Sequence, residues 1–119
     1  MGDSFQAAEL TDAVAQARAG DGYAGEVLRS DLLSVGLYLL PAGGADDQSP
    51  HNEDEVYYAV SGRAKLRVGD EDHPVQAGTL LFVPALAAHF FHDIEEELVM
   101  VVFWAPPEKS VHPRGLSRS

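Results

Sequence analysis

Short runs in which apolar residues alternate with polar ones fill the middle of the chain, and this period of two is typical of β-strands. Glycine, proline and aspartate separate the runs at short intervals, as turn residues do. The pattern predicts strands over residues 23–29, 33–40, 55–61, 64–68, 73–75, 79–83, 89–94 and 98–105. Because no long helical segments alternate with these strands, the pattern indicates an antiparallel sandwich or barrel and excludes a parallel α/β sheet.

Residues 3–20 have helical spacing instead, with Leu10, Val14 and Ala17 recurring on one side. This helix is short and rich in alanine, so we expect it to lie against the sheet. The strand predicted over 98–105 is apolar on both faces, and its outer face therefore needs a cover. Either the N-terminal helix or a second subunit would provide that cover.

The chain has 119 residues, which is enough for one hydrophobic core but not for two. We therefore expect a single β domain over residues 33–105. A helix and an edge segment over 1–32 precede it, and a disordered tail over 106–119 follows it.

Acidic residues outnumber basic ones, 19 to 8, and the formal net charge is −11. A chain this acidic is repelled by phosphate backbones and anionic lipid head groups, so we expect neither nucleic acid nor a membrane as its partner. The sequence contains no cysteine, which excludes disulfides, thiolate metal ligands and cysteine nucleophiles. Because no secretory signal is readable at the N-terminus, we expect the protein in the cytoplasm.

Two histidines and a glutamate form the candidate site of the chain. His51 lies in a polar loop four residues before Glu55, which begins an apolar strand, and His89 begins a later strand. Two imidazoles and one carboxylate suit Fe(II) and related divalent ions and leave open positions on the metal. The sequence therefore predicts a site for Fe, Mn, Ni or Zn. The alternative is that Glu55 lies in solvent at a rim and the two histidines bond to each other.

Other polar residues of the same loop are candidates for an additional metal ligand or for support of the first three. Gln48 and Ser49 could each contribute an oxygen, and Glu53 is a competing carboxylate that shares a face with Glu55 if the chain there is extended. No catalytic residue is assigned.

Apolar side chains are expected to line a cavity beside the ion. Tyr57 shares the face of Glu55, and Phe91 shares the face of His89. Further wall residues are expected at Leu37, Leu39, Leu81 and Met100. Walls of this kind predict a small, mostly nonpolar or aromatic ligand with one oxygen on the metal.

The site residues resemble the first motif of the cupin family. That motif runs glycine, a spacer, His-x-His, three or four residues, glutamate, six residues and glycine. His51, Glu55 and Gly62 stand at its spacing, and Ser49 occupies the place of the first histidine.

A second stretch resembles the other cupin motif, Gly-x5-Pro-x-Gly-x2-His-x3-Asn. Gly78, Pro84 and His89 match it in register, whereas Leu86 replaces the second glycine and Asp93 the asparagine. Both partial motifs occur in order within residues 33–105, which makes the resemblance fairly specific for the fold.

The resemblance implies an antiparallel jelly-roll β-barrel, also called a double-stranded β-helix, with a site in its mouth. It also implies metal-dependent dioxygenase or isomerase chemistry on a small organic molecule, and a homodimer. Whether the chain is an enzyme is left open. The alternative is a non-catalytic small-molecule-binding cupin with a degenerate metal site, which the residues at 49, 86 and 93 would suggest. A third alternative is an interaction protein that uses residues 98–104.

Overall fold

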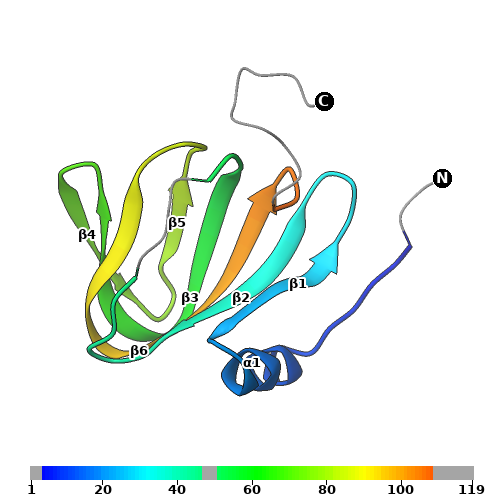
Figure 1. Ribbon diagram of the computed structural model, residues 1–119, viewed down its shortest axis with the longest axis horizontal. Coiled ribbons are helices and arrows are strands. Elements are labelled where there is room, and N and C mark those ends of the chain that lie inside the picture. The colour runs from blue at the N-terminus through cyan, green and yellow to red at the C-terminus, as the bar shows by residue number, and fades with distance from the viewer. Residues whose placement is uncertain (1–3, 47–50, 109–119) are drawn as a thin grey trace.

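The computed structural model describes residues 4–46 and 51–108, which form one helix and an antiparallel sheet (Figure 1). The elements are α1 (Leu10–Ala19), β1 (Tyr23–Arg29), β2 (Ser34–Leu40), β3 (Asp54–Val68), β4 (Glu71–Gln76), β5 (Leu80–Val83) and β6 (His89–Ala105). The expected antiparallel β fold with a short N-terminal helix is confirmed. Four of the predicted strands join in pairs, because β3 continues through residues 62–63 and β6 continues through residues 95–97, where the pattern predicts gaps between strands.

The strands pair in the order β1-β2-β6-β3-β4, and β5 pairs with β3 beside β4. The two ends of this path are β1 and β4, which lie at opposite ends of the sheet in Figure 1. Among the described strands, the path therefore does not close on itself.

The long strands β3 and β6 divide the sheet into two halves. The first part of β3 pairs with β5 and with the end of β6, and its last part pairs with β4 and with the start of β6. The strand bends at Gly62, where φ is +104° and an added Cβ would lie 2.2 Å from the carbonyl oxygen of Glu97. Only glycine combines this backbone conformation with so close an approach. The bend lets the inner faces of the two halves share one core.

Side chains from the inner faces of both halves form the main hydrophobic cluster, in accord with strand alternation. Its fully buried members include Tyr57, Leu66, Phe91, Met100 and Trp104. The rings of Tyr57 and Phe91 meet edge to face with centroids 5.1 Å apart. Three of the expected cavity residues, Tyr57, Phe91 and Met100, therefore lie on the inner side.

A second cluster lies on the other side of the sheet, under the helix. Ala13 and Ala17 of α1 pack there against Leu37, Leu39 and Val99. This confirms that the helix lies against the sheet, where it contacts β1 and β2, while Val99 of the last strand belongs to the same cluster.

The positions of Leu37 and Leu39 correct an expectation. Both pack under α1 instead of lining an inner cavity. The neighbours Tyr38 and Leu40 face the main cluster, because the sides alternate along β2.

Residues 106–108, which belong to the expected tail, are described and pack against the sheet. The backbone N–H of Glu108 donates to Ser34 Oγ at 3.0 Å, and the Tyr23 hydroxyl donates to the Glu108 carboxylate. Burial, followed by the bond to Glu108, raises the pKa of Tyr23 above its usual range. The rest of the tail, 109–119, lies outside the described residues. In the part of the chain that is described, no helix is long and apolar enough to cross a membrane. The domain limits and the cytoplasmic location stay predictions.

Candidate metal centre

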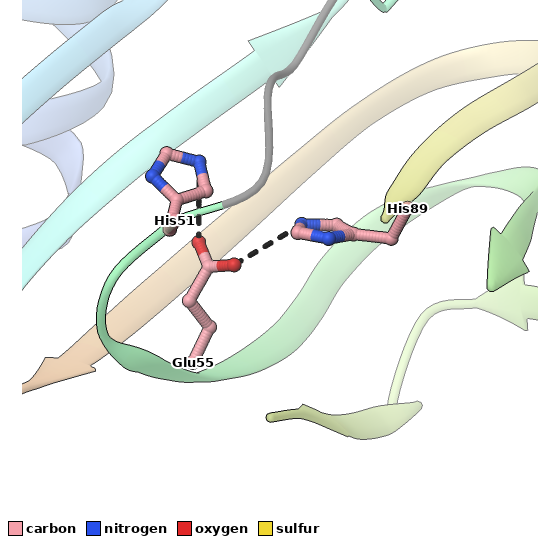
Figure 2. A group of neighbouring side chains, drawn as sticks. All are labelled: His51, Glu55 and His89. Atoms are coloured by element: carbon pink, nitrogen blue, oxygen red, sulfur yellow. Dashed lines mark ion pairs between the residues drawn. The ribbon is translucent and has the colours of Figure 1, made fainter. Parts of the chain in front are cut away.

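Three elements of the chain bring His51, Glu55 and His89 together (Figure 2). His51 precedes β3, Glu55 is the second residue of β3, and His89 is the first residue of β6. The His51 carbonyl oxygen accepts a hydrogen bond of 2.7 Å from the backbone N–H of Leu86, which ties the segment before β3 to the loop before β6. This contact holds the two histidines on the same side of Glu55.

The ligand atoms of the three residues all lie within 4.8 Å of one another. His89 Nε2 is 3.1 Å from Glu55 Oε1, and His51 Nε2 is 3.8 Å from Glu55 Oε2. The side chains of Glu55 and His89 are each 1% exposed, whereas that of His51 is 26% exposed. A buried carboxylate and imidazole therefore face a histidine that is open to solvent on one side.

Two further side chains hold the Glu55 carboxylate in place. The Tyr57 hydroxyl donates to Oε2 at 3.1 Å, and the Trp104 indole Nε1–H donates to the same oxygen at 2.9 Å. The Tyr57 oxygen is also 3.1 Å from His89 Nε2. The sequence pattern does not assign the Tyr57 hydroxyl or Trp104 to the site. Trp104 would have been found if the pairing of Glu55 with Trp104 across β3 and β6 had been known.

A backbone carbonyl fixes the orientation of the His89 ring. His89 Nδ1 lies 2.8 Å from the Ala87 carbonyl oxygen, to which it donates when the ring is neutral. Nε2, which faces Glu55, is then left without a proton, as a metal ligand must be. Burial lowers the pKa of His89. The bonds to Glu55 and Ala87 and the charges of Glu55 and Asp46 outweigh burial, so the pKa is raised overall.

The donor set fits a divalent ion. Two metal–ligand bonds of about 2.1 Å place their ligand atoms at most about 4.2 Å apart. The separations of 3.1 and 3.8 Å from Glu55 lie within this range. The largest separation in the group, 4.8 Å, needs only a small shift, and the partly exposed His51 has room to make it. Three protein ligands leave open positions on the ion.

Comparison with known proteins assigns the fold family. The family model of the cupin domain matches residues 36–106. This chain belongs to the cupin family. An uncharacterized protein of Streptomyces coelicolor is 47% identical to this cupin over 104 residues, which are 87% of this chain and 99% of the relative.

Two solved structures show the same likeness. The protein TT1209 of Thermus thermophilus has 33% identity and a TM-score of 0.58, over 68% of this chain and 79% of that one. An RmlC-like cupin of Methanocaldococcus jannaschii, with a double-stranded β-helix fold, has 19% identity and a TM-score of 0.62. The match covers 69% of this chain and 77% of that one. The expected family is thereby confirmed.

The backbone of this cupin is left-handed at its two departures from the second motif. Leu86, in place of the glycine, has φ +70°, and Asp93, in place of the asparagine, has φ +49°. Glycine and asparagine are the residues that adopt this left-handed conformation most readily. Leu86 and Asp93 therefore adopt a conformation that is uncommon for residues other than glycine and asparagine.

The remaining candidate ligands of this cupin have different positions. Gln48 and Ser49 lie outside the described residues. Glu53 is buried, and its Oε1 is 4.0 Å from His51 Nδ1, on the opposite side of that ring from Glu55. Glu53 therefore contacts the metal-site histidine without joining the cluster of three.

A cavity of about 300 Å³ lies between β4 and β5 of the cupin, two strands that both pair with β3. Leu66, Val68 and Leu81 are among its apolar lining residues. That Leu81 lines a cavity beside the ion stays a prediction. Glu71, Asp72 and His73 give the cavity polar lining residues. Val68 is the cross-strand partner of His89, which places this cavity next to the metal centre along the sheet.

Proposed function

We propose that this cupin holds a divalent metal ion through His51, Glu55 and His89 and uses it to bind and transform a small organic molecule. The observation that carries the proposal is the meeting of three metal-ligand side chains, whose ligand atoms lie within 4.8 Å of one another and whose carboxylate is 1% exposed. Burying a carboxylate is costly, and a cation would offset the part of that cost that the hydrogen bonds from Tyr57 and Trp104 leave. When bound, the metal would supply Lewis-acid or oxygen-activating chemistry, which suits a dioxygenase or an isomerase.

The residues around the three ligands have separate roles in this proposal. Ala87 orients His89, and Trp104 and Tyr57 orient Glu55. The Tyr57 hydroxyl donates to Glu55 Oε2 at 3.1 Å and lies 3.1 Å from His89 Nε2, so it holds the two ligands at a fixed separation. The partly exposed His51 lies on the side from which an ion would enter.

The cavity between β4 and β5 supports a small-molecule partner. Its volume of about 300 Å³ is at the lower end of the range of ligand sites, and its inner wall is apolar. Glu71 and His73 in its lining would face a polar end of the ligand. We infer that the bent sheet acts as the jelly-roll barrel expected from the sequence, with this cavity as a way in. The absence of nucleic-acid and membrane partners stays a prediction.

The test is the metal content of protein purified without chelator, measured by mass spectrometry for wild type, His51→Ala and His89→Ala. We expect about one equivalent of Fe, Mn, Ni or Zn in the wild type and loss of that metal in both variants. His92→Ala is the matched control, because the His92 side chain is 24% exposed, close to the 26% of His51, and contacts Asp72 outside the cluster. Wild-type protein that takes up none of these ions, even after reconstitution, would contradict the proposal. Binding of a small molecule without catalysis, at a degenerate metal site, would then be the better proposal.

A further inference from the structure

Glu53 is a buried carboxylate that does not belong to the cluster of three ligands. It is 2% exposed, and its Oε1 lies 4.0 Å from His51 Nδ1. On the other side of the same ring, His51 Nε2 is 3.8 Å from Glu55 Oε2. The imidazole of His51 therefore lies between two buried carboxylates. Both separations exceed hydrogen-bond length, so the partly exposed ring needs a small turn to bond to Glu53.

Two contacts of the neighbouring chain hold Glu53 beside this ring. The chain bends immediately before β3. On one side of the bend, the His51 carbonyl oxygen accepts a hydrogen bond of 2.7 Å from the Leu86 N–H. On the other side, Asp54 Oδ1 accepts one of 2.9 Å from the Ala85 N–H. Since both bonds go to the loop before β6, the segment from His51 to Asp54 is fixed at both ends, and Glu53 stays on the Nδ1 side of the ring.

His89 shows the same arrangement with a different acceptor. Its Nδ1 is 2.8 Å from the Ala87 carbonyl oxygen, and its Nε2 faces Glu55. Both histidines of the cluster therefore direct Nε2 at Glu55 and Nδ1 at an oxygen outside the cluster. For His89 that oxygen belongs to a carbonyl, and for His51 it belongs to the carboxylate of Glu53.

The partner of one ring nitrogen decides which nitrogen of a neutral imidazole carries the proton. An acceptor at Nδ1 draws the proton there and leaves the lone pair of Nε2 for a metal. The ring of His51 needs such a partner more than that of His89, because its side chain is 26% exposed against 1%. Water can bond to either nitrogen of an exposed ring, so without Glu53 both tautomers of His51 would be populated.

From these contacts we propose that Glu53 is the positioning residue of His51, which it holds with the proton on Nδ1 and the Nε2 lone pair toward Glu55. This role rests on the proposed function, since it prepares His51 to bind a metal ion. Glu53 acts through His51 and does not touch the ion. A carboxylate acceptor also forms a stronger hydrogen bond than a carbonyl does, and it makes the imidazole a more basic ligand.

The first measurement is the tautomer of His51 in metal-free protein, with chelator present. The nitrogen chemical shifts of the ring report it at a pH where the ring is neutral, and His51→Ala assigns the signals. We expect the proton on Nδ1 in the wild type. In Glu53→Leu the signals should move toward a mixture of the two tautomers. Glu53→Gln should keep the wild-type form, because its amide oxygen still accepts a proton from Nδ1.

The second measurement is the affinity for Zn²⁺ by competition calorimetry. Glu53→Leu should weaken binding roughly 10- to 100-fold, as the loss of a partner behind a metal-binding histidine does. The loss in Glu53→Gln should be smaller. Glu108→Leu is the matched control and should bind Zn²⁺ like the wild type. Glu108 is also buried, at 9% exposed, but its carboxylate accepts from the Tyr23 hydroxyl and not from a histidine of the cluster.

The two measurements together decide the role of Glu53, provided that circular dichroism shows all variants folded. A tautomer change and a loss of affinity in Glu53→Leu, both largely restored in Glu53→Gln, support the proposal. A wild-type ring with its proton on Nε2, or a tautomer that Glu53→Leu leaves unchanged, overturns it. Equal losses of affinity in Glu53→Leu and Glu53→Gln also overturn it, because Glu53 would then be a ligand itself.

Failure of the proposed function would look different. A wild type that takes up no ion contradicts the metal centre, whereas the tautomer is measured without metal and decides the orientation of His51 separately. In protein that binds Zn²⁺, a tautomer that changes in Glu53→Leu with no loss of affinity would overturn the positioning role and leave the metal centre intact.

Discussion

Trp104 donates its indole N–H to Oε2 of Glu55 at 2.9 Å, and the two residues are direct cross-strand partners on β6 and β3. Trp104 is also the one tryptophan in the sequence. The fluorescence of the protein therefore comes from a ring that touches the carboxylate of the candidate metal centre.

Titration of metal-free protein with Zn²⁺ or Mn²⁺ should change the tryptophan emission, because a cation on Glu55 alters the charge next to the indole. The change should saturate near one equivalent, in parallel with binding measured by calorimetry. In Glu55→Gln the emission should stay constant over the same range. Calorimetric binding with no change in emission would show that the ion lies away from Glu55.

Tyr57→Phe should destabilise metal-free protein by about 1–2 kcal/mol, because it removes a buried hydroxyl that bonds to both Glu55 and His89. Urea unfolding with chelator present measures this change. Tyr58→Phe is the control from the same strand. Its hydroxyl is on the exposed side, so its cost should stay within about 0.5 kcal/mol. Equal effects of the two variants would contradict the role of Tyr57.

The pH dependence of metal-free protein should follow His89. Its pKa in the folded protein is raised above the ordinary 6.5, so its contribution to stability is fully present below pH 6.5 and is lost as the pH rises through the folded pKa. The free energy of unfolding should therefore fall as the pH rises from 6.5 through the raised pKa of the folded protein. In Glu55→Gln, which removes a group that raises the pKa, the fall should be smaller.

Metal binding should depend on pH in the opposite sense, because the ion binds neutral imidazole and competes with the proton. Metal affinity should therefore increase over the same pH range. A metal affinity that is independent of pH would argue against His89 as a ligand.

The sequence predicted the strands and the three clustered residues, because strand alternation and motif spacing are local properties of the chain. It could not predict which side of β2 faces the core, since that strand is apolar on both sides. Only its register with β6 and the position of α1 place Leu37 and Leu39 under the helix. In the same way, Trp104 reaches Glu55 through a pairing between residues that are 49 positions apart.

Gly62 shows why a turn was predicted where the structure has a bend. Glycine and the short polar stretch around it are typical of turns. The chain instead continues as one strand, because β6 pairs with it on both sides of the bend, with register shifts between Ala59 and Lys65. Long-range pairing therefore overrides the local signal.

Gly62→Ala should lower the free energy of unfolding by about 3 kcal/mol or more, because backbone strain and a steric clash act together. Its φ is +104°, and the new Cβ would meet the backbone oxygen of Glu97 at 2.2 Å. Gly78→Ala separates the two effects, since φ there is a similar +95° but no atom lies within 4 Å of the added Cβ. That control should cost only about 1–2 kcal/mol, the strain of a left-handed residue. Urea unfolding of both variants measures the difference, which isolates the close approach of β3 and β6 at the bend. If both substitutions cost the same, the bend does not depend on that contact.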